Sequence, residues 1–172
     1  MADYFAAKIR IGGRISQHLI DDIANIVVLN GITTEYGGTS FASRDEAKQH
    51  ILDCIGNKEV LVFQDDQARY GLFPELEDFL QINKIDYDKH SDGYTEFDAN
   101  NVYQRDGRLY TFGSNQSEQD LIGIKAIQKL VCIPAVLDSD GRFDGIQTYE
   151  NLRAGLKKLA PRIPDLQPLL AI

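Results

Sequence analysis

The sequence predicts an α+β protein in which antiparallel β-hairpins combine with about five helices. Segments that alternate apolar and polar residues are separated by turn-forming dipeptides, and between them lie segments with helical apolar spacing and capping residues. Of the 172 residues, 43% are apolar, which is enough for a real core. We expect one domain over residues 1–160 and a proline-rich C-terminal strap over 161–172. The succession of elements also allows a ferredoxin-like sandwich.

The N-terminal third is predicted to fold as a strand followed by two helices. Residues 4–15 alternate apolar and polar side chains up to a pair of glycines, as in a strand with one buried face. Ser16 is placed to cap a helix that ends near Asn30. Ser43 and Glu46 have the spacing of a capping box and predict the start of a second helix.

Further elements follow from short apolar runs and turn signals. The run over 60–63 predicts an interior strand, and Pro74 opens a helix with acids in its first turn. Turn residues predict two hairpins, around 91–93 and 105–107. The remaining predicted elements are a helix over 117–130, a hairpin around 139–141 and a helix over 149–159.

The most informative feature of the sequence is a concentration of acidic residues. Residues 64–98 contain ten acids and only three basic residues, whereas the whole chain has a net charge of −8. A three-residue turn at 91–93 would pair Tyr87 with Phe97, which keeps the hydrophobic side chains on one face. We therefore expect a hairpin whose other face is strongly acidic.

Four carboxylates would face one another on this hairpin. Asp86 would lie opposite Asp98, and Asp88 opposite Glu96. Like charges in direct cross-strand pairs destabilise a sheet by about 0.2–1 kcal/mol each. A basic protein surface or a divalent cation would relieve this repulsion; the alternative is a solvated sheet face that resists aggregation. The predicted binding residues are Asp86, Asp88, Glu96 and Asp98.

A second hypothesis is catalytic. Asp65 and Asp66 follow an apolar strand, where α/β enzymes often place carboxylates, and His90 lies on the predicted acidic face. Two acids and a histidine could support metal-assisted hydrolysis. Acids after a strand are also common turn formers, so this metal site remains the weaker hypothesis.

Composition and motifs exclude several classes of function. The net negative charge argues against direct nucleic-acid binding, although an acidic surface can also mimic nucleic acid. No nucleotide-binding motif points to a cofactor. Two cysteines in apolar stretches and the lack of a signal-like or membrane-spanning run indicate a cytoplasmic protein.

The sequence therefore favours a binding protein over an enzyme. We expect its acidic surface to meet a basic protein partner or another copy of the same chain. The alternative function is a metal-assisted hydrolase that uses Asp65, Asp66 and His90.

Overall fold

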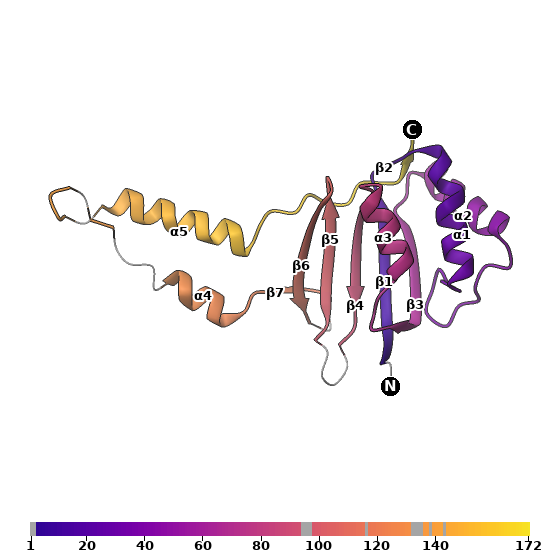
Figure 1. Ribbon diagram of the computed structural model, residues 1–172, viewed down its shortest axis with the longest axis horizontal. Coiled ribbons are helices and arrows are strands. Elements are labelled where there is room, and N and C mark those ends of the chain that lie inside the picture. Colours follow the sequence, from indigo (N-terminus) through magenta and orange to yellow (C-terminus); the bar gives the residue numbers. More distant parts are fainter. Residues whose placement is uncertain (1–2, 94–97, 116, 132–135, 138, 143) are drawn as a thin grey trace. The chain divides into compact units, whose positions relative to one another are not determined.

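The computed structural model confirms the α+β class: among the residues that it describes, a six-stranded sheet is combined with five α-helices (Figure 1). It describes the chain except for residues 1–2, 94–97, 116, 132–135, 138 and 143. The described chain divides into two compact units. Unit 1 comprises residues 1–120 and 164–172, and unit 2 comprises 121–163, where the sequence alone led us to expect one domain over 1–160.

Unit 1 is built on the sheet. Its neighbouring strands β3, β1, β4, β5 and β6 pair antiparallel throughout. In spatial order the strands are β3 (Leu61–Arg69), β1 (Tyr4–Gly12), β4 (Asp86–Ser91), β5 (Asn100–Arg105), β6 (Arg108–Ser114) and the short β7 (Asp120–Leu121). The element order differs from the βαββαβ succession of a ferredoxin-like fold, because a helix separates β3 from β4.

The core lies on one face of this sheet. Along β1 every second side chain is buried, and Ile9 and Ile11 are completely inaccessible. Their cross-strand neighbours Phe63 and Tyr87 are equally buried, so the inner face is continuous across three strands. Three helices supply the other half of the core: α1 (Ile20–Leu29), α2 (Arg44–Asn57) and α3 (Pro74–Ile82).

Of the helix caps predicted at Ser16 and Ser43, the structure confirms only the second. The Ser43 Oγ accepts a hydrogen bond from the Glu46 amide at 3.2 Å, which confirms the start of α2. The prediction that Ser16 caps α1 through its side chain is wrong. A 3-10 turn, Gln17–Leu19, intervenes, so Leu19 stands at the N-cap of α1 and the Ser16 hydroxyl makes no capping bond.

The predicted register of the acidic hairpin is also wrong. β4 pairs with residues 100–105, so that Tyr87 lies opposite Gln104 and Asp88 opposite Tyr103. This register buries Gln104, whose amide donates to the Leu80 and Ile85 carbonyls at 2.9 and 2.8 Å. β4 pairs with the later segment, residues 100–105, because this register satisfies the two buried carbonyl groups. The hydrophobic pattern alone does not reveal these acceptors.

The C-terminal segment of unit 1, residues 164–172, packs along one end of the sheet. Its short strand β8 (Leu170–Ala171) pairs in parallel with β2 (Arg14–Ile15), and Leu169 is completely buried. The backbone also passes so close to Gly12 that a β-carbon there would stand 2.1 Å from the Gln167 carbonyl oxygen. Only glycine fits at this crossing.

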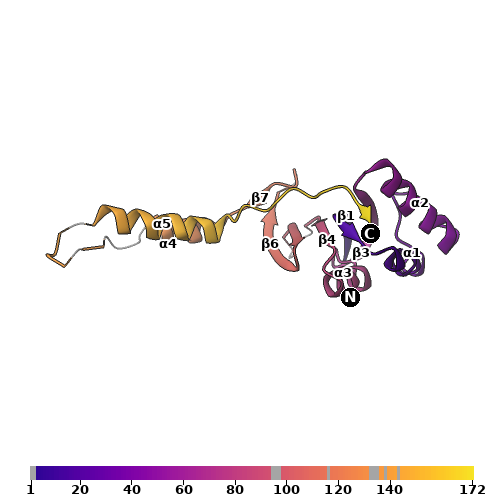
Figure 2. The ribbon, with the colours of Figure 1, turned by 90° about the horizontal axis from the view of Figure 1, so that it is seen from above.

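Unit 2 consists of two helices that lie alongside each other, α4 (Ile124–Val131) and α5 (Gly145–Leu159) (Figure 2). The Asp144 carboxylate caps α5 by accepting from the Gln147 amide at 2.9 Å. The helix predicted over 117–130 begins too early, because α4 starts only at Ile124. The hairpin expected around 139–141 falls partly outside the described residues. Its second strand was expected over 142–146, which is wrong because α5 already begins at Gly145.

Candidate functional site

The face of the sheet opposite the core is polar. Cross-strand neighbours form two rows on it: Lys8, His90 and Asn101 in one, and Arg10, Asp88 and Tyr103 in the other. Together with Glu118 these side chains surround a pocket of about 140 Å³. We call this surface the polar sheet face. It contains two of the residues that the sequence singled out, Asp88 and His90.

Asp88 is neutralised inside the protein. The Arg105 guanidinium lies 2.6 Å from one carboxylate oxygen, and the Arg10 guanidinium lies 3.8 Å from the other. Arg105 is itself nearly inaccessible and also donates to the Tyr87 and Pro164 carbonyls. The carboxylate therefore has a built-in counter-charge and serves to hold Arg105 in place.

The Asp86 carboxylate is near enough to Asp88 for the two negative charges to repel, but its hydrogen-bond partner is a different one. One Asp86 oxygen accepts from the Asp106 amide at 3.0 Å, and burial raises the pKa of Asp86 above its ordinary value. Asp98 is exposed before the start of β5, and Glu96 lies outside the described residues. The expected repulsion of Asp86 by Asp98 and of Asp88 by Glu96 is therefore absent from the observed pairing, since β4 pairs with 100–105.

His90 is also held by internal partners. Its Nδ1 lies 2.7 Å from the Asn101 Oδ1, and its Nε2 lies 3.2 Å from an Asp92 oxygen. The Asn101 amide nitrogen donates to Asp120 and to the Glu118 carbonyl, which fixes its oxygen toward the ring. Both ring nitrogens thus face oxygen acceptors, and His90 and Asn101 together link β4, β5 and residues 118–120.

The residues of the hydrolase hypothesis are spread over different places. Asp65 pairs across the sheet with Ala7, whereas His90 pairs with Lys8, so the two side chains project from opposite faces. The Asp66 carboxylate accepts from the Gly37 amide at 2.8 and 3.0 Å. Within the described residues, no group of three or more His, Cys, Asp or Glu side chains is arranged to hold a metal ion.

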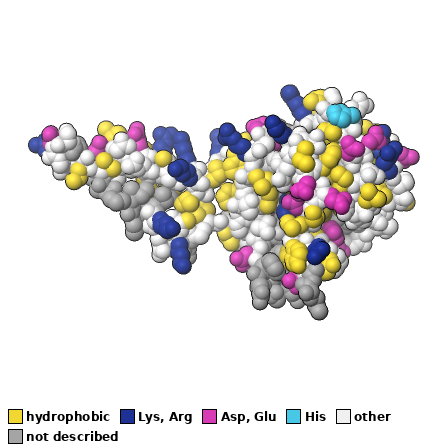
Figure 3. Space-filling model, viewed as in Figure 1, with side chains coloured by type: hydrophobic (Ala, Val, Ile, Leu, Met, Phe, Trp, Pro, Cys, Tyr) yellow, Lys and Arg dark blue, Asp and Glu magenta, His cyan; other side chains and the backbone are white. Residues whose placement is uncertain are grey.

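An acidic surface that the sequence reasoning missed lies on the neighbouring helices α1 and α3. The two helices contain five acids and no basic residue. Asp21 pairs with Lys48 and Glu77 with Lys89, both at 3.0 Å, which leaves the other three acids to the solvent. Figure 3 shows acidic side chains beside hydrophobic ones over the region of α3. The α1–α3 surface is formed by Asp22, Leu29, Glu75, Asp78 and Ile82.

Two apolar side chains of the α1–α3 surface are strongly exposed. Leu29 is 72% exposed and Ile82 is 79% exposed, the highest values for large hydrophobic residues in the described part of unit 1. The Asn30 amide donates to the Glu75 carboxylate at 2.9 Å and so joins the end of α1 to the start of α3. The absence of basic residues from both helices was the available sequence signal.

Unit 2 differs from unit 1 in the burial of its side chains. None of the unit 2 residues whose burial is described is buried, and α5 carries apolar side chains at successive spacings of three, four and three residues. Tyr149 is 62% exposed and Leu156 is 51% exposed. Arg153 lies four residues after Tyr149, and Lys157 lies four residues after Arg153, so these basic residues are neighbours of the apolar ones on α5. The α5 stripe comprises Tyr149, Leu152, Arg153, Leu156, Lys157 and Leu159.

The net charges of the two units have opposite signs. Unit 1 contains 22 acidic and 11 basic residues, a net charge of −11, and unit 2 contains four acidic and seven basic residues, a net charge of +3. Among the described residues, no helix has the length and apolar character needed to cross a membrane. Comparison of the chain with protein-family models, with curated proteins and with solved structures finds no match.

Proposed function

We propose that this protein is a non-catalytic interaction protein that assembles with copies of itself. The α5 stripe of one copy docks on the α1–α3 surface of another. The observation that carries the proposal is the separation of charge between the units, −11 on unit 1 and +3 on unit 2. The sequence placed the acidic binding surface on Asp86, Asp88, Glu96 and Asp98, whereas this proposal uses a different acidic surface, on α1 and α3.

Net charge favours contact between unit 1 of one copy and unit 2 of another over contact between two copies of the same unit. Contact between two copies of unit 1, or between two copies of unit 2, brings surfaces of like net charge together. Contact between unit 1 and unit 2 brings opposite charges together, which favours encounter and register. On α5, Arg153 and Lys157 are available for the carboxylates of Glu75 and Asp78.

Apolar burial supplies the affinity. A unit of only 43 residues gains little from its own core, and none of its side chains whose burial is described is buried. Docking would cover Tyr149 and Leu156 of one copy together with Leu29 and Ile82 of the other. Exposed apolar residues bordered by charged ones are typical of protein interaction sites. Tyr149 is the expected anchor, because tyrosine is enriched among residues that dominate interface energies.

The proposed contact is heterologous, since different surfaces of the two copies meet. Such contacts close into rings or continue into open chains, depending on the rotation between successive copies. A basic protein of other sequence could occupy the same α1–α3 surface. We place the assembly in the cytoplasm, which agrees with the unpaired, buried Cys54 thiol, whose pKa burial raises.

Sedimentation velocity over a range of concentrations tests the proposal. We expect the average mass to rise with concentration at low salt and to fall at high salt, because opposite charges are screened. Glu75→Gln with Asp78→Asn should weaken assembly about tenfold or more. The matched control, Asp53→Asn with Glu59→Gln, removes two exposed charges outside the α1–α3 surface and should leave assembly unchanged.

Two results would overturn the proposal. The first is a monomer at every concentration at low salt. The second is assembly that persists at high salt and in the Glu75→Gln, Asp78→Asn variant but is lost on Leu156→Ser, since that pattern would assign the contact to apolar pairing between two α5 helices.

A further inference from the structure

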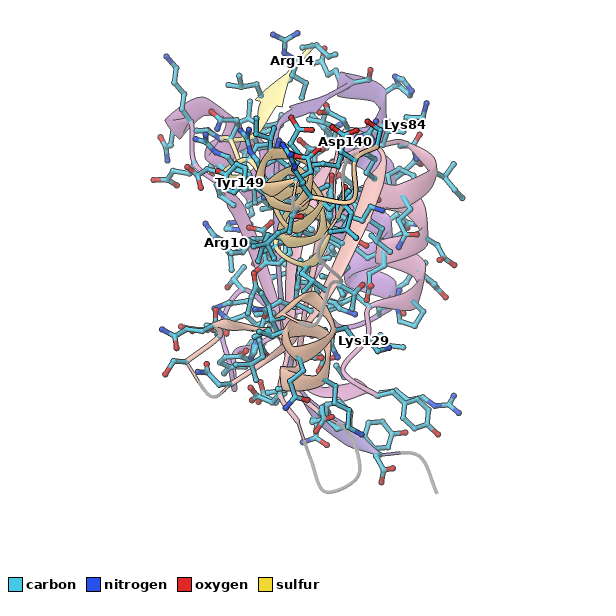
Figure 4. All side chains as sticks on the ribbon, turned by 90° about the vertical axis from the view of Figure 1, so that its left-hand side faces the viewer. Arg10, Arg14, Lys84, Lys129, Asp140 and Tyr149 are labelled. Atoms are coloured by element: carbon cyan, nitrogen blue, oxygen red, sulfur yellow. The ribbon has the colours of Figure 1, made fainter. Side chains whose placement is uncertain are left out.

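A second pocket lies at one end of the sheet of unit 1, apart from the α1–α3 surface. Its volume is about 610 Å³, within the usual range of roughly 300–1,000 Å³ for ligand sites. Segments far apart in the sequence line it, including Arg14 on β2, Lys84 after α3, Asp86 at the start of β4 and Asp106 in the β5–β6 turn. We call it the end pocket. Figure 4 labels Arg14 and Lys84.

The C-terminal segment closes one side of the end pocket. Leu170 donates to the Gly13 carbonyl at 2.8 Å, and Gly13 donates to the Gln167 carbonyl at 3.0 Å. Pro168 lies between these two contacts and lines the pocket. The wall is therefore fixed by backbone hydrogen bonds.

Three basic side chains line the end pocket: Arg14, Lys58 and Lys84. Within the described part of the chain, none of the three has a carboxylate within ion-pair distance. Unit 1 carries a net charge of −11, so three cations without an ion-pair partner stand out against their surroundings, and they outnumber the two carboxylates in the same lining, Asp86 and Asp106.

The backbone at two of these cations is unusual. Lys58 and Lys84 follow the ends of α2 and α3 with φ angles of 57° and 55°. Glycine and asparagine are the residues that adopt this left-handed conformation most easily at helix ends. A lysine there gains a favourable interaction with the helix C-terminus, but that interaction explains neither Arg14 nor the fact that both lysines line one pocket.

Two carboxylates in the end pocket, those of Asp86 and Asp106, can accept hydrogen bonds, and a backbone contact orients Asp86. One oxygen of Asp86 is held by the Asp106 amide, and the other oxygen lies on the side of Gly13. Because Asp86 is partly desolvated, a hydroxyl donor would improve its surroundings. Asp106 itself has a φ angle of 51° and also lines the pocket.

We propose that the end pocket binds a small phosphorylated polyol, such as a sugar phosphate. The phosphate oxygens would accept hydrogen bonds from Arg14, Lys58 and Lys84, which are strong because both partners are charged. The hydroxyl groups would donate to Asp86 and Asp106. This site is independent of self-assembly, because its residues lie outside both docking surfaces.

The test is a titration of the full, ¹⁵N-labelled chain with ribose 5-phosphate, followed by NMR. Ribose and inorganic phosphate are titrated separately as the two halves of the ligand. We expect ribose 5-phosphate to shift the amide signals of Gly13, Asp106 and Leu170 at lower concentrations than either half does. Measurement at high salt and low protein concentration keeps self-assembly out of the readout.

Variants assign the binding to the named cations. Arg14→Gln together with Lys84→Asn should weaken binding about tenfold or more, and asparagine tolerates the left-handed backbone at position 84. The matched control is Arg108→Gln, which removes an exposed charge from the same unit but not from the pocket lining, and binding should persist.

Three results would overturn the site. One is the absence of shifts at millimolar ribose 5-phosphate, and another is an equal response to sodium sulfate, which would show general anion screening only. The third is equal affinity of the pocket variant and the wild type. A failure here leaves the concentration dependence of the mass untouched, so it is distinguishable from a failure of the proposed assembly.

Discussion

Unit 1 and unit 2 differ in where their apolar side chains go. In unit 1 the inner face of the sheet and three helices bury a continuous core, and side chains of the polar sheet face form ion pairs and hydrogen bonds with one another. In unit 2 Ile146, Tyr149 and Leu156 of α5 remain exposed, and none of the residues whose burial is described is buried. Unit 1 therefore derives its stability from its own interior, whereas unit 2 leaves apolar side chains open for the assembly proposed above.

The largest expected effect follows from deleting part of the core of unit 1. Phe63→Ala removes a completely buried ring and should lower the free energy of unfolding by about 3–5 kcal/mol. Tyr149→Ala in unit 2 should change it by less than about 0.5 kcal/mol in the monomer, because the side chain is exposed. Urea unfolding at low protein concentration and high salt measures both values. Equal effects would contradict the difference between the units.

A buried ion pair within unit 1 gives the next largest effect. The Lys89 ammonium lies 3.0 Å from Glu77 and its side chain is only 2% exposed. Glu77→Leu should destabilise by about 3 kcal/mol, because it leaves a buried charge without a partner. Adding Lys89→Met should recover most of this loss. A double variant as unstable as the single one would show that the charge of Lys89 is not the cause.

A smaller effect is expected where the C-terminal segment crosses Gly12. Gly12→Ala places a β-carbon against Gln167 and Leu166 and should cost about 1–3 kcal/mol through displacement of the segment. Hydrogen exchange should become faster at the Leu170 and Ile172 amides, which bond to the Gly13 and Ile15 carbonyls. Unchanged protection of these amides would contradict the proposed tight crossing.

The smallest predicted effect concerns the polar sheet face and pH. Lys8 donates to Glu118 at 2.6 Å, which lowers the pKa of Glu118 below its ordinary value of 4.5. This stabilisation is present above the ordinary value and is lost as the pH falls through the lowered pKa. The Glu118 side chain is about half exposed, so we expect less than about 1 kcal/mol.

Glu118→Gln measures this contribution. Urea unfolding of the variant and the wild type should differ at neutral pH and converge in acid. A difference that grows as the pH falls would contradict the assigned cause.

The sequence predicted much of the fold because local signals were sufficient for it. The capping box at Ser43 and Pro74 at the start of α3 both correspond to observed helix starts. The alternation along β1 correctly identified its buried face. Each of these features depends on residues close together in the chain, which pattern analysis can assess.

The site was harder to predict because its contacts are long-range. The pairing of Asp88 with Arg105 joins residues 17 positions apart, and the hydrogen bonds of Gln104 decide the strand register. Charge counting found the acidic stretch but could not separate the internally paired Asp88 from the exposed Glu75 and Asp78. Only the fold assigns partners to these carboxylates.

A charge-reversal exchange between two variants tests the proposed assembly most directly. Variant A carries Glu75→Lys and Asp78→Lys on unit 1, and variant B carries Arg153→Glu and Lys157→Glu on unit 2. In each variant alone the two docking surfaces have the same sign of charge. In the mixture, unit 2 of A can dock on unit 1 of B, and unit 2 of B on unit 1 of A.

Sedimentation velocity of A, of B and of their equimolar mixture gives the answer. We expect A and B each to remain monomeric at concentrations where the wild type assembles, and we expect mixing them to restore assembly. A mixture that stays monomeric, or single variants that assemble like the wild type, would contradict the proposed assembly.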